Sequence, residues 1–447
     1  MKHTISRREL FQHGAASGGV VAASSILLEA APISAPQNPA ASDRVRFGMI
    51  GVGMQGSGLL STAIGLPGVE CVGAADLWDG RHTLAREITN NPSLPTTRRY
   101  KELLDRKDID CIVAAVPDHW HRRVVVDACS AGKDIYCEKP MSHTISDGFA
   151  MVEAARANKR IVQIGSQRVS SALCAKARSL YQGGAIGNVE FVELTMGRND
   201  PNGAWVYPPP NVTPQTLDWD TWLNDAPKIP FDPVRFARWR CWREYGTGVG
   251  GDLMVHLLSG MLFTLGWNEP PQSAAALGGI FRFNDGRNMP DVHLVLFDYH
   301  GVPVYVRLDL CSQSPETARF YGPKGILEAS GGELRYVPQS GVDTAPSYYS
   351  GGFPSKLREQ YVSQWRAEHV IPPGKEALRE TAVFQSDNWD DLRPHMWNFF
   401  QAVKTRGTIT EDAVFGNHAA TACHMANESY FRKAPVYWDN STHNVRA

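Results

Sequence analysis

Asp252 and His256 are the residues whose types and spacing most directly suggest chemistry. They are four positions apart in "GGDLMVHLLSG", so a helix here places both side chains on one face. A carboxylate beside an imidazole fixes the tautomer of the ring and raises its basicity, which suits proton transfer at a hydroxyl group. The alternative is a solvated surface pair, but the flanking glycines and leucines favour the wall of a buried cleft.

Lys139 is the second chemical candidate, in the stretch "KDIYCEKPMS". An apolar, strand-like run leads directly into Glu138 and Lys139, which are either a solvated turn or a charged pair in a cleft. Pro140 pushes the backbone of the preceding residue toward extended conformations, just where a parallel strand leaves its sheet. This restriction favours the second interpretation, in which Lys139 points into the cleft.

A glycine motif precedes both candidates in the chain. Gly51, Gly53 and Gly56 form G-x-G-x-x-G between an expected strand and an expected helix, with Met54 and Gln55 inside the motif. The first glycine allows a tight turn, the second lets the backbone approach a pyrophosphate, and the helix N-terminus supplies amide donors. The motif predicts a dinucleotide site, and the alternative is a structural glycine turn.

Asp76 ends the next expected strand, at the position that accepts hydrogen bonds from an adenosine ribose. An acid there repels a 2'-phosphate, so we expect NAD in preference to NADP. The alternative role of Asp76 is a helix N-cap.

The segment "AAVPDHWH" ends a further buried strand at the carboxyl edge of the sheet, where doubly wound folds bind ligands. We expect Pro117, His119 and His121 to line the cofactor cleft. Asp118 either lines the same cleft or serves only as the N-cap of the next helix. A third ligand at a recognisable spacing is lacking, so we predict no metal site.

Strands and helices alternate at short spacing through residues 43–168, which predicts a doubly wound parallel sheet, the Rossmann dinucleotide-binding domain. Residues 169–447 have the pattern of an α+β domain with one large, mainly antiparallel open sheet. Residues 201–233, rich in Pro and Trp, predict an ordered surface loop that either covers the cleft or mediates subunit contacts. Residues 337–391 show no regular pattern. The α/β fold class follows from the first domain.

The chain of 447 residues carries a formal net charge of −1, which gives no basic surface for nucleic acid. After the N-terminal region, no stretch reaches the roughly 18 apolar residues of a membrane span. Residues 1–42 resemble a twin-arginine export signal, with "SRREL" before a weakly apolar run. We therefore expect recognition by the twin-arginine export machinery and a periplasmic or secreted protein. A disordered basic tail is the alternative.

Together, "GVGMQG" with Asp76, "AAVPDHWH", "CEKP" and Asp252-x-x-x-His256 resemble the glucose-fructose oxidoreductase, inositol dehydrogenase and MocA (Gfo/Idh/MocA) family. The resemblance covers essentially the whole chain after the export signal. It implies a Rossmann domain followed by an open-sheet domain. It also implies oxidation or reduction of a secondary alcohol on a sugar or polyol with a nicotinamide cofactor. Open sheets of this kind often pair face to face, so we expect a homo-oligomer.

The resemblance also implies roles for individual residues. Lys139 would contact the substrate hydroxyl near the nicotinamide, and His256 would be the general base or acid. Asp252 would hold His256 or bind the substrate, and Glu138 would help to seat the nicotinamide ribose. From their place where the sheet meets the second domain, Gln167 and Arg168 are expected substrate contacts. Ser259 departs from the pattern, since many of these dehydrogenases carry an acid there.

Three functions remain open from the sequence, and the first is the sugar or polyol oxidoreductase that the resemblance implies. An exported enzyme meets no replenished NAD pool, so we expect a tightly bound cofactor that is recycled on the enzyme. The alternative is a NAD-dependent glycoside hydrolase or lyase, which oxidises, eliminates and reduces in one redox-neutral cycle. The family includes such enzymes, although their histidine-centred pattern is not recognised in "VHLLSG". A non-catalytic sugar-binding protein is the third possibility.

Overall fold

The computed structural model describes residues 4–5, 26–28, 44–339, 345–370, 380–386 and 391–446. The predicted export signal, with its paired arginines Arg7 and Arg8, lies outside the described residues. Within those ranges, no helix is long and apolar enough to cross a membrane. All eight cysteines fall in the described part and are free thiols, and six of them are buried.

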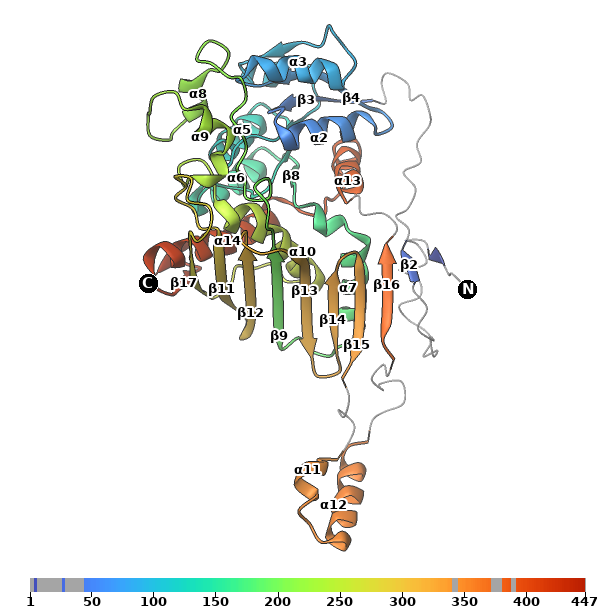
Figure 1. Cartoon of the computed structure of the whole chain (residues 1–447). Coiled ribbons are helices and arrows are strands. Elements are labelled where there is room, and N and C mark those ends of the chain that lie inside the picture. The colour runs from blue at the N-terminus through green and yellow to red at the C-terminus, as the bar shows by residue number, and fades with distance from the viewer. Residues whose placement is uncertain are drawn as a thin grey trace.

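The first domain is a parallel sheet with helices on both faces, as the alternating pattern predicts (Figure 1). Its six strands lie in the order β5-β4-β3-β6-β7-β8, and every neighbouring pair is parallel. The strands are β3 (Val45–Ile50), β4 (Val69–Ala75), β5 (Thr96–Thr97), β6 (Cys111–Ala114), β7 (Asp134–Cys137) and β8 (Val162–Ile164). The helices are α2 (Met54–Ile64), α3 (Asp79–Ile88), α4 (Lys101–Leu104), α5 (Asp118–Ser130) and α6 (Ile145–Ala157). All four residues of the central strand β6 are buried, which explains its continuously apolar sequence.

A helix from the far end of the chain completes this domain. In α13 (Leu392–Thr405), Phe399 and Phe400 join the core on one face of the parallel sheet. The rings of Phe400 and Phe47 have centroids 5.5 Å apart. The Rossmann core therefore depends on residues that lie between strands β16 and β17 of the second sheet in the sequence.

The second domain is built on a sheet of 12 strands in the order β1-β2-β16-β15-β14-β13-β9-β12-β11-β10-β17-β18. Its central strands pair antiparallel, apart from the parallel pair β9 and β12. The strands are β1 (Thr4–Ile5), β2 (Ile26–Leu28), β9 (Phe191–Gly197), β10 (Ser273–Gly279), β11 (Val292–Tyr299), β12 (Val302–Asp309), β13 (Ser314–Gly322), β14 (Gly325–Ser330), β15 (Glu333–Pro338), β16 (Ala382–Ser386), β17 (Val436–Asp439) and β18 (Asn444–Arg446). The predicted fold class, a Rossmann domain followed by a mainly antiparallel open sheet, is confirmed.

Helices cover one face of this large sheet. They are α7 (Ala172–Gln182), α10 (Val255–Leu265) and α14 (Ala413–Arg432), which share a core with the inward residues of the strands. Burial alternates along β11 and β12, so the outward residues of these strands are more exposed than the inward ones. The helices also connect the two domains, because α14 packs against α6 of the first domain as well as against β10.

The expectation of irregular chain between residues 337 and 391 is wrong for its described parts. Helices α11 (Ser347–Ser350) and α12 (Ser355–Glu368) lie at the end of the large sheet remote from the Rossmann domain (Figure 1). Strand β16 extends the sheet beside β15. No residue of α12 is fully buried, and Tyr361 is half-buried against the rings of Tyr349 and Phe353.

Candidate active site

A cleft of about 1040 Å³ is lined by residues of both domains. Its volume is ample for a dinucleotide together with a small substrate. Eleven of the residues predicted from the sequence line it: Gly51, Gly53, Met54, Gln55, Asp76, Pro117, Glu138, Lys139, Gln167, Asp252 and His256. Gly56, His119, His121 and Arg168 do not. The binding roles of the lining residues stay predictions.

The glycine turn at the end of β3 has the geometry that a dinucleotide site needs. Gly51 has φ of 83°, and a Cβ on it would come within 2.5 Å of the Ala115 carbonyl oxygen. A Cβ on Gly56 would come within 2.1 Å of the Gly51 carbonyl oxygen, so Gly56 lets α2 pack closely on the turn. A Cβ on Gly53 would meet nothing within 4 Å. Gly53 therefore faces open space, where a pyrophosphate can approach the backbone.

Asp76, at the end of β4, is held beside this turn. Its carboxylate accepts hydrogen bonds from Val52 N at 2.8 Å and from Trp78 N at 3.0 Å. Burial raises the pKa of Asp76, and these two backbone donors oppose that shift. The bond from Trp78 N holds the Asp76 carboxylate at the start of α3. Asp76 also lines the cleft, as a ribose site requires.

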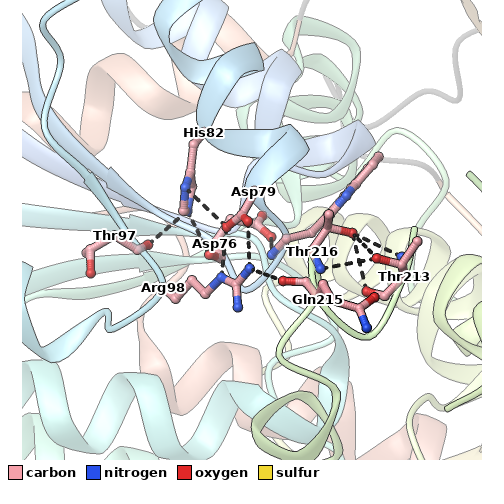
Figure 2. A network of polar contacts seen from close by, with 9 residues as sticks. Asp76, Asp79, His82, Thr97, Arg98, Thr213, Gln215 and Thr216 are labelled. Carbon is pink, nitrogen blue, oxygen red and sulfur yellow. Dashed lines mark hydrogen bonds and ion pairs between the residues drawn. The ribbon is translucent and has the colours of Figure 1, made fainter. Parts of the chain in front are cut away.

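A segment of the second domain closes the Asp76 end of the cleft. We call residues 213–224 the clasp; Figure 2 shows part of it beside Asp76 and His82. Arg98 binds both carboxylate oxygens of Asp79 and also donates to the Gln215 carbonyl oxygen at 2.8 Å. Asp79 N donates to the Thr216 carbonyl oxygen at 3.0 Å. The predicted surface loop thus covers the cleft and is fixed to the Rossmann domain.

His119 holds the other end of the clasp and does not line the cofactor cleft as expected. Its ring nitrogens lie 2.9 Å from the Trp222 carbonyl oxygen and 3.2 Å from the Tyr245 carbonyl oxygen. Burial lowers the pKa of His119 to about 4, so the ring is neutral at pH 7. Arg123 adds a bond to Asn224 Oδ1 at 2.6 Å.

His121 is also buried away from the cleft, which corrects the second histidine prediction. Its ring nitrogens lie 2.7 Å from the Pro140 carbonyl oxygen and 2.9 Å from the Val116 carbonyl oxygen. The ring therefore braces the chain after β7, where the Lys139–Pro140 peptide bond is cis. Asp118 is not the N-cap of α5 either, because its carboxylate accepts from Thr247 N and Oγ1.

Glu138 is buried and lines the cleft. Its Oε1 accepts hydrogen bonds from Gln55 Nε2 and Gln167 Nε2, both at 3.0 Å, and its Oε2 accepts from Lys139 N at 3.1 Å. Burial raises the pKa of Glu138, although the Lys139 charge and these donors oppose the shift. Glu138 thus ties the glycine turn to Gln167, which follows β8.

Lys139 and Asp252 form an ion pair across the two domains. Lys139 Nζ donates to Asp252 Oδ1 at 2.9 Å and to the Asp252 carbonyl oxygen at 2.8 Å. Arg240 Nε donates to the same Oδ1 at 3.0 Å. Burial alone would raise the pKa of Asp252, but the charges of Lys139 and Arg240 hold it far below its ordinary value. Asp252 is therefore a carboxylate throughout the physiological pH range.

His256 lines the cleft at the start of α10, but not as the partner of Asp252 that we expected. Among the described residues, no hydrogen bond joins the two, because Asp252 is engaged by two cations that form stronger charge-assisted bonds. Burial, followed by the Lys139 charge, lowers the pKa of His256 well below its ordinary value. His256 is a neutral imidazole beside a cation, and thus able to accept a proton.

Arg168 is turned away from the cleft, which corrects its prediction as a substrate contact. Its guanidinium binds both oxygens of Glu316, at 3.0 and 3.1 Å, and Asp391 Oδ2 at 3.0 Å. These bonds tie the chain after β8 to β13 and to the start of α13. Local sequence could not reveal this, because both acids lie more than a hundred residues later.

Several lining residues escaped the sequence analysis. Arg240 and Trp239 come from "RFARWRCW", and Arg198 comes directly after β9. None belongs to a motif with a fixed spacing. The density of Trp and Arg in these segments was the only signal that could have pointed to them.

Residues 45–166 match the family model described as "Oxidoreductase family, NAD-binding Rossmann fold" (GFO_IDH_MocA). Over these residues the first domain is similar to this family of NAD-binding domains. The glycine turn and Asp76 fit that cofactor, so NAD is the cofactor of the domain.

Matches to curated relatives cover only part of this chain. The inositol 2-dehydrogenase of Salmonella typhimurium is 31% identical over 147 residues, which cover 32% of this chain and 43% of the relative. A glycosyl hydrolase family 109 protein of Saccharopolyspora erythraea is 26% identical over 269 residues, 56% of this chain and 52% of the relative. The chain thus spans about half or less of these relatives.

A solved structure resembles the whole fold. The aldose-aldose oxidoreductase from Caulobacter crescentus, crystallised with glycerol, has a TM-score of 0.62. It is 16% identical, and the match covers 88% of this chain and 99% of the other. At this identity the likeness shows the fold, including the open sheet, and nothing about the substrate.

Proposed function

We propose that this protein is an NAD-dependent oxidoreductase acting on a secondary alcohol of a sugar or polyol, and that its cofactor stays bound between turnovers. The observation that carries the proposal is the constellation of Lys139, Asp252 and neutral His256 in a cleft that begins at the glycine turn. Both curated relatives named above are called enzymes of sugars or cyclitols.

The cofactor would lie along the first domain. The α2 N-terminus and Gly53 would hold its pyrophosphate, Asp76 would hold the adenosine ribose, and Glu138 the nicotinamide ribose. When bound, NAD⁺ would supply the acceptor for the hydride that leaves the alcohol carbon, and this carbon would lose two electrons and become a carbonyl carbon.

The chain's own residues handle the remaining proton. His256 is neutral and takes the hydroxyl proton on an imidazole nitrogen, as a general base must. Lys139, fixed by its two bonds to Asp252, stabilises the negative charge that develops on the alcohol oxygen. In the reductive direction, the imidazolium returns its proton to the new hydroxyl group.

The clasp supports the retention of the cofactor. It bonds to the Rossmann domain at both of its ends, through Arg98 and through His119. A bound dinucleotide would have to leave past these contacts. Retention suits a protein exported in folded form by the twin-arginine route, which forms part of this proposal. A second sugar carbonyl would then reoxidise the bound cofactor.

The first test is the spectrum and mass of whatever nucleotide co-purifies with the full chain. We expect near-stoichiometric NAD(H), and we expect added sugars or polyols to reduce it without further NAD. Protein that carries no nucleotide and binds none would contradict the proposal.

A NAD-dependent glycoside hydrolase is the second candidate, because the glycosyl hydrolase family 109 relative matches more than half of the chain. Its cycle would use the same lysine and histidine but return the hydride to the same sugar. Aryl glycosides incubated without added NAD separate the two. Release of the aglycone with no net cofactor reduction favours the hydrolase, and net reduction without release favours the oxidoreductase.

A further inference from the structure

Arg198 is a cation of the cleft that the proposed reaction does not use. It follows directly after β9, and its backbone N donates to the Asp309 carbonyl oxygen at 2.8 Å. The side chain is half-buried and lines the cleft. Its charge acts on both His256 and Tyr207, so the guanidinium lies in the substrate half of the cleft.

The guanidinium of Arg198 lacks a protein partner. Among the described residues, no acid lies within ion-pair distance of it, and no acceptor forms a hydrogen bond with it. Asp200, two residues later, and Asp309, whose carbonyl accepts from Arg198 N, bond to other groups. Asp200 Oδ1 accepts from Gly203 N at 2.7 Å, and Asp309 Oδ1 accepts from Cys311 N at 2.6 Å.

The other arginine on this side shows how different Arg198 is. Arg240 donates to Asp252 Oδ1 at 3.0 Å, and its guanidinium carbon lies 4.2 Å from the Trp239 ring centroid. Lys139 shares the same carboxylate. Lys139 and Arg240 thus both pair with Asp252. Arg198 adds a third positive charge, which pairs with no acid among the described residues.

Two other acids of the described cleft lining, Asp118 and Glu138, form no ion pair with Arg198. The Asp118 carboxylate accepts from Thr247 N and Oγ1, and its charge acts on Arg240. Glu138 already accepts from Gln55, Gln167 and the Lys139 backbone, on the Rossmann side of the cleft. An unpaired guanidinium in a partly buried site is best satisfied by a carboxylate, which matches its planar fork of donors. The pyrophosphate of the cofactor has its own place at the glycine turn, in the other domain.

We propose that Arg198 is the specificity-determining residue of the substrate site and binds a carboxylate carried by the substrate. The substrate class is then an acidic sugar or polyol, a uronate or an aldonate, whose secondary alcohol faces Lys139 and His256. This inference rests on the proposed function only for the reaction, since binding of the acid can be measured without turnover.

The test compares acidic and neutral ligands of the same carbon skeleton on the full chain with its bound cofactor. Glucuronate and galacturonate represent uronates, gluconate represents aldonates, and glucose, galactose and glucitol are the neutral counterparts. Binding is measured by calorimetry, and kcat/KM is measured where turnover occurs. We expect the acid to be favoured roughly 10- to 100-fold, the range for a charged hydrogen bond.

Substitution then assigns the preference to one residue. Arg198→Met should bring the ratio of acid to neutral ligand close to one, and Arg198→Lys should keep part of it. Arg44→Met is the matched control, because Arg44 is exposed, pairs with Glu70 and lies outside the cleft. It should leave the ratio unchanged.

Three results would overturn the inference. They are a wild-type protein that binds neutral and acidic ligands equally, an Arg198→Met protein that keeps the preference, and an Arg198→Met protein that loses its bound NAD. The proposed function fails separately, if acids bind through Arg198 but no sugar or polyol reduces the cofactor. A preference for uronates without a preference for aldonates would identify the ring form of the acid as the ligand. A preference for aldonates alone would identify the open-chain form.

Discussion

The two halves of the cleft are held by different kinds of contact. In the cofactor half, the carboxylates of Asp76 and Glu138 accept hydrogen bonds mainly from backbone and amide groups, and burial raises their pKa values. In the substrate half, Asp252 lies between Lys139 and Arg240, and its pKa is lowered.

This difference separates binding from chemistry. Contacts in the cofactor half lie within or next to one domain and shape a surface for a dinucleotide. Contacts in the substrate half join the two domains through full charges, so they fix the reacting groups relative to one another. We therefore expect substitutions in the cofactor half to change affinity, and substitutions in the substrate half to change turnover.

The largest effect should come from Lys139→Met. Loss of the ammonium removes the stabilising charge and leaves Asp252 paired with Arg240 alone, so kcat should fall roughly 10²- to 10⁴-fold. The amount of bound NAD, measured by mass after denaturation, should stay the same. Unchanged turnover would mean that Lys139 has no catalytic role and would leave the non-catalytic sugar-binding alternative standing.

Gly53→Ala should act on affinity alone. Its Cβ would meet no protein atom within 4 Å, so the fold tolerates it, but it would project where the pyrophosphate approaches. We expect the Kd for NAD to rise more than about tenfold, which is about 1.4 kcal/mol.

Gly58→Ala is the matched control, because Gly58 also has open space but faces solvent one turn later in α2. It should leave NAD affinity unchanged. Equal losses of NAD affinity in the two variants would show that the effect comes from a change in helix α2. The approach of the pyrophosphate to the Gly53 backbone would then not be the cause.

Arg98→Met should loosen the clasp. The Arg98 and Asp79 side chains are 33% and 48% exposed, so solvent weakens the pair. We expect release of bound NAD to speed up only about two- to fivefold, as for other exposed pairs. Stopped-flow exchange against a fluorescent NAD analogue measures this rate. Arg44→Met should not change the rate of NAD release. An unaltered rate in Arg98→Met would show that the clasp does not retain the cofactor.

The smallest effect concerns pH. A folded-state pKa of His256 far below its ordinary value keeps the imidazole neutral from about pH 6 to 8. Asp252 stays ionised over the same range, since its pKa is lowered. The pre-steady-state rate of oxidation should therefore change less than about twofold across that range. A change of this rate with pH, centred near the ordinary pKa of histidine, would show that His256 is exposed or is not the base.

The same contrast explains what the sequence could predict. The glycine turn, Asp76 and Glu138 lie in short segments whose order along parallel strands puts them at one sheet edge, so their location followed from local patterns. Arg240 and Arg198 belong to no motif, and their position depends on how a long segment folds over the cleft.

Errors arose where a side chain takes a distant partner. His119 bonds to the carbonyl of Trp222, about a hundred residues later, and Arg168 binds Glu316, 148 residues later. The types of these residues suit a ligand site equally well. Only the tertiary fold shows that backbone and acid groups of the protein already occupy them.

The most direct test of the central claim is the near-ultraviolet absorbance of the bound nicotinamide in one sequential experiment. Full-length protein without added NAD is mixed with a sugar or polyol, and then with a second, carbonyl-bearing sugar. We predict that dihydronicotinamide absorbance rises to at most one equivalent per chain and falls again in the second step, with both steps slowed by Lys139→Met. Absorbance that never changes, although NAD is bound, would contradict the assignment of this cleft as the active site of an oxidoreductase.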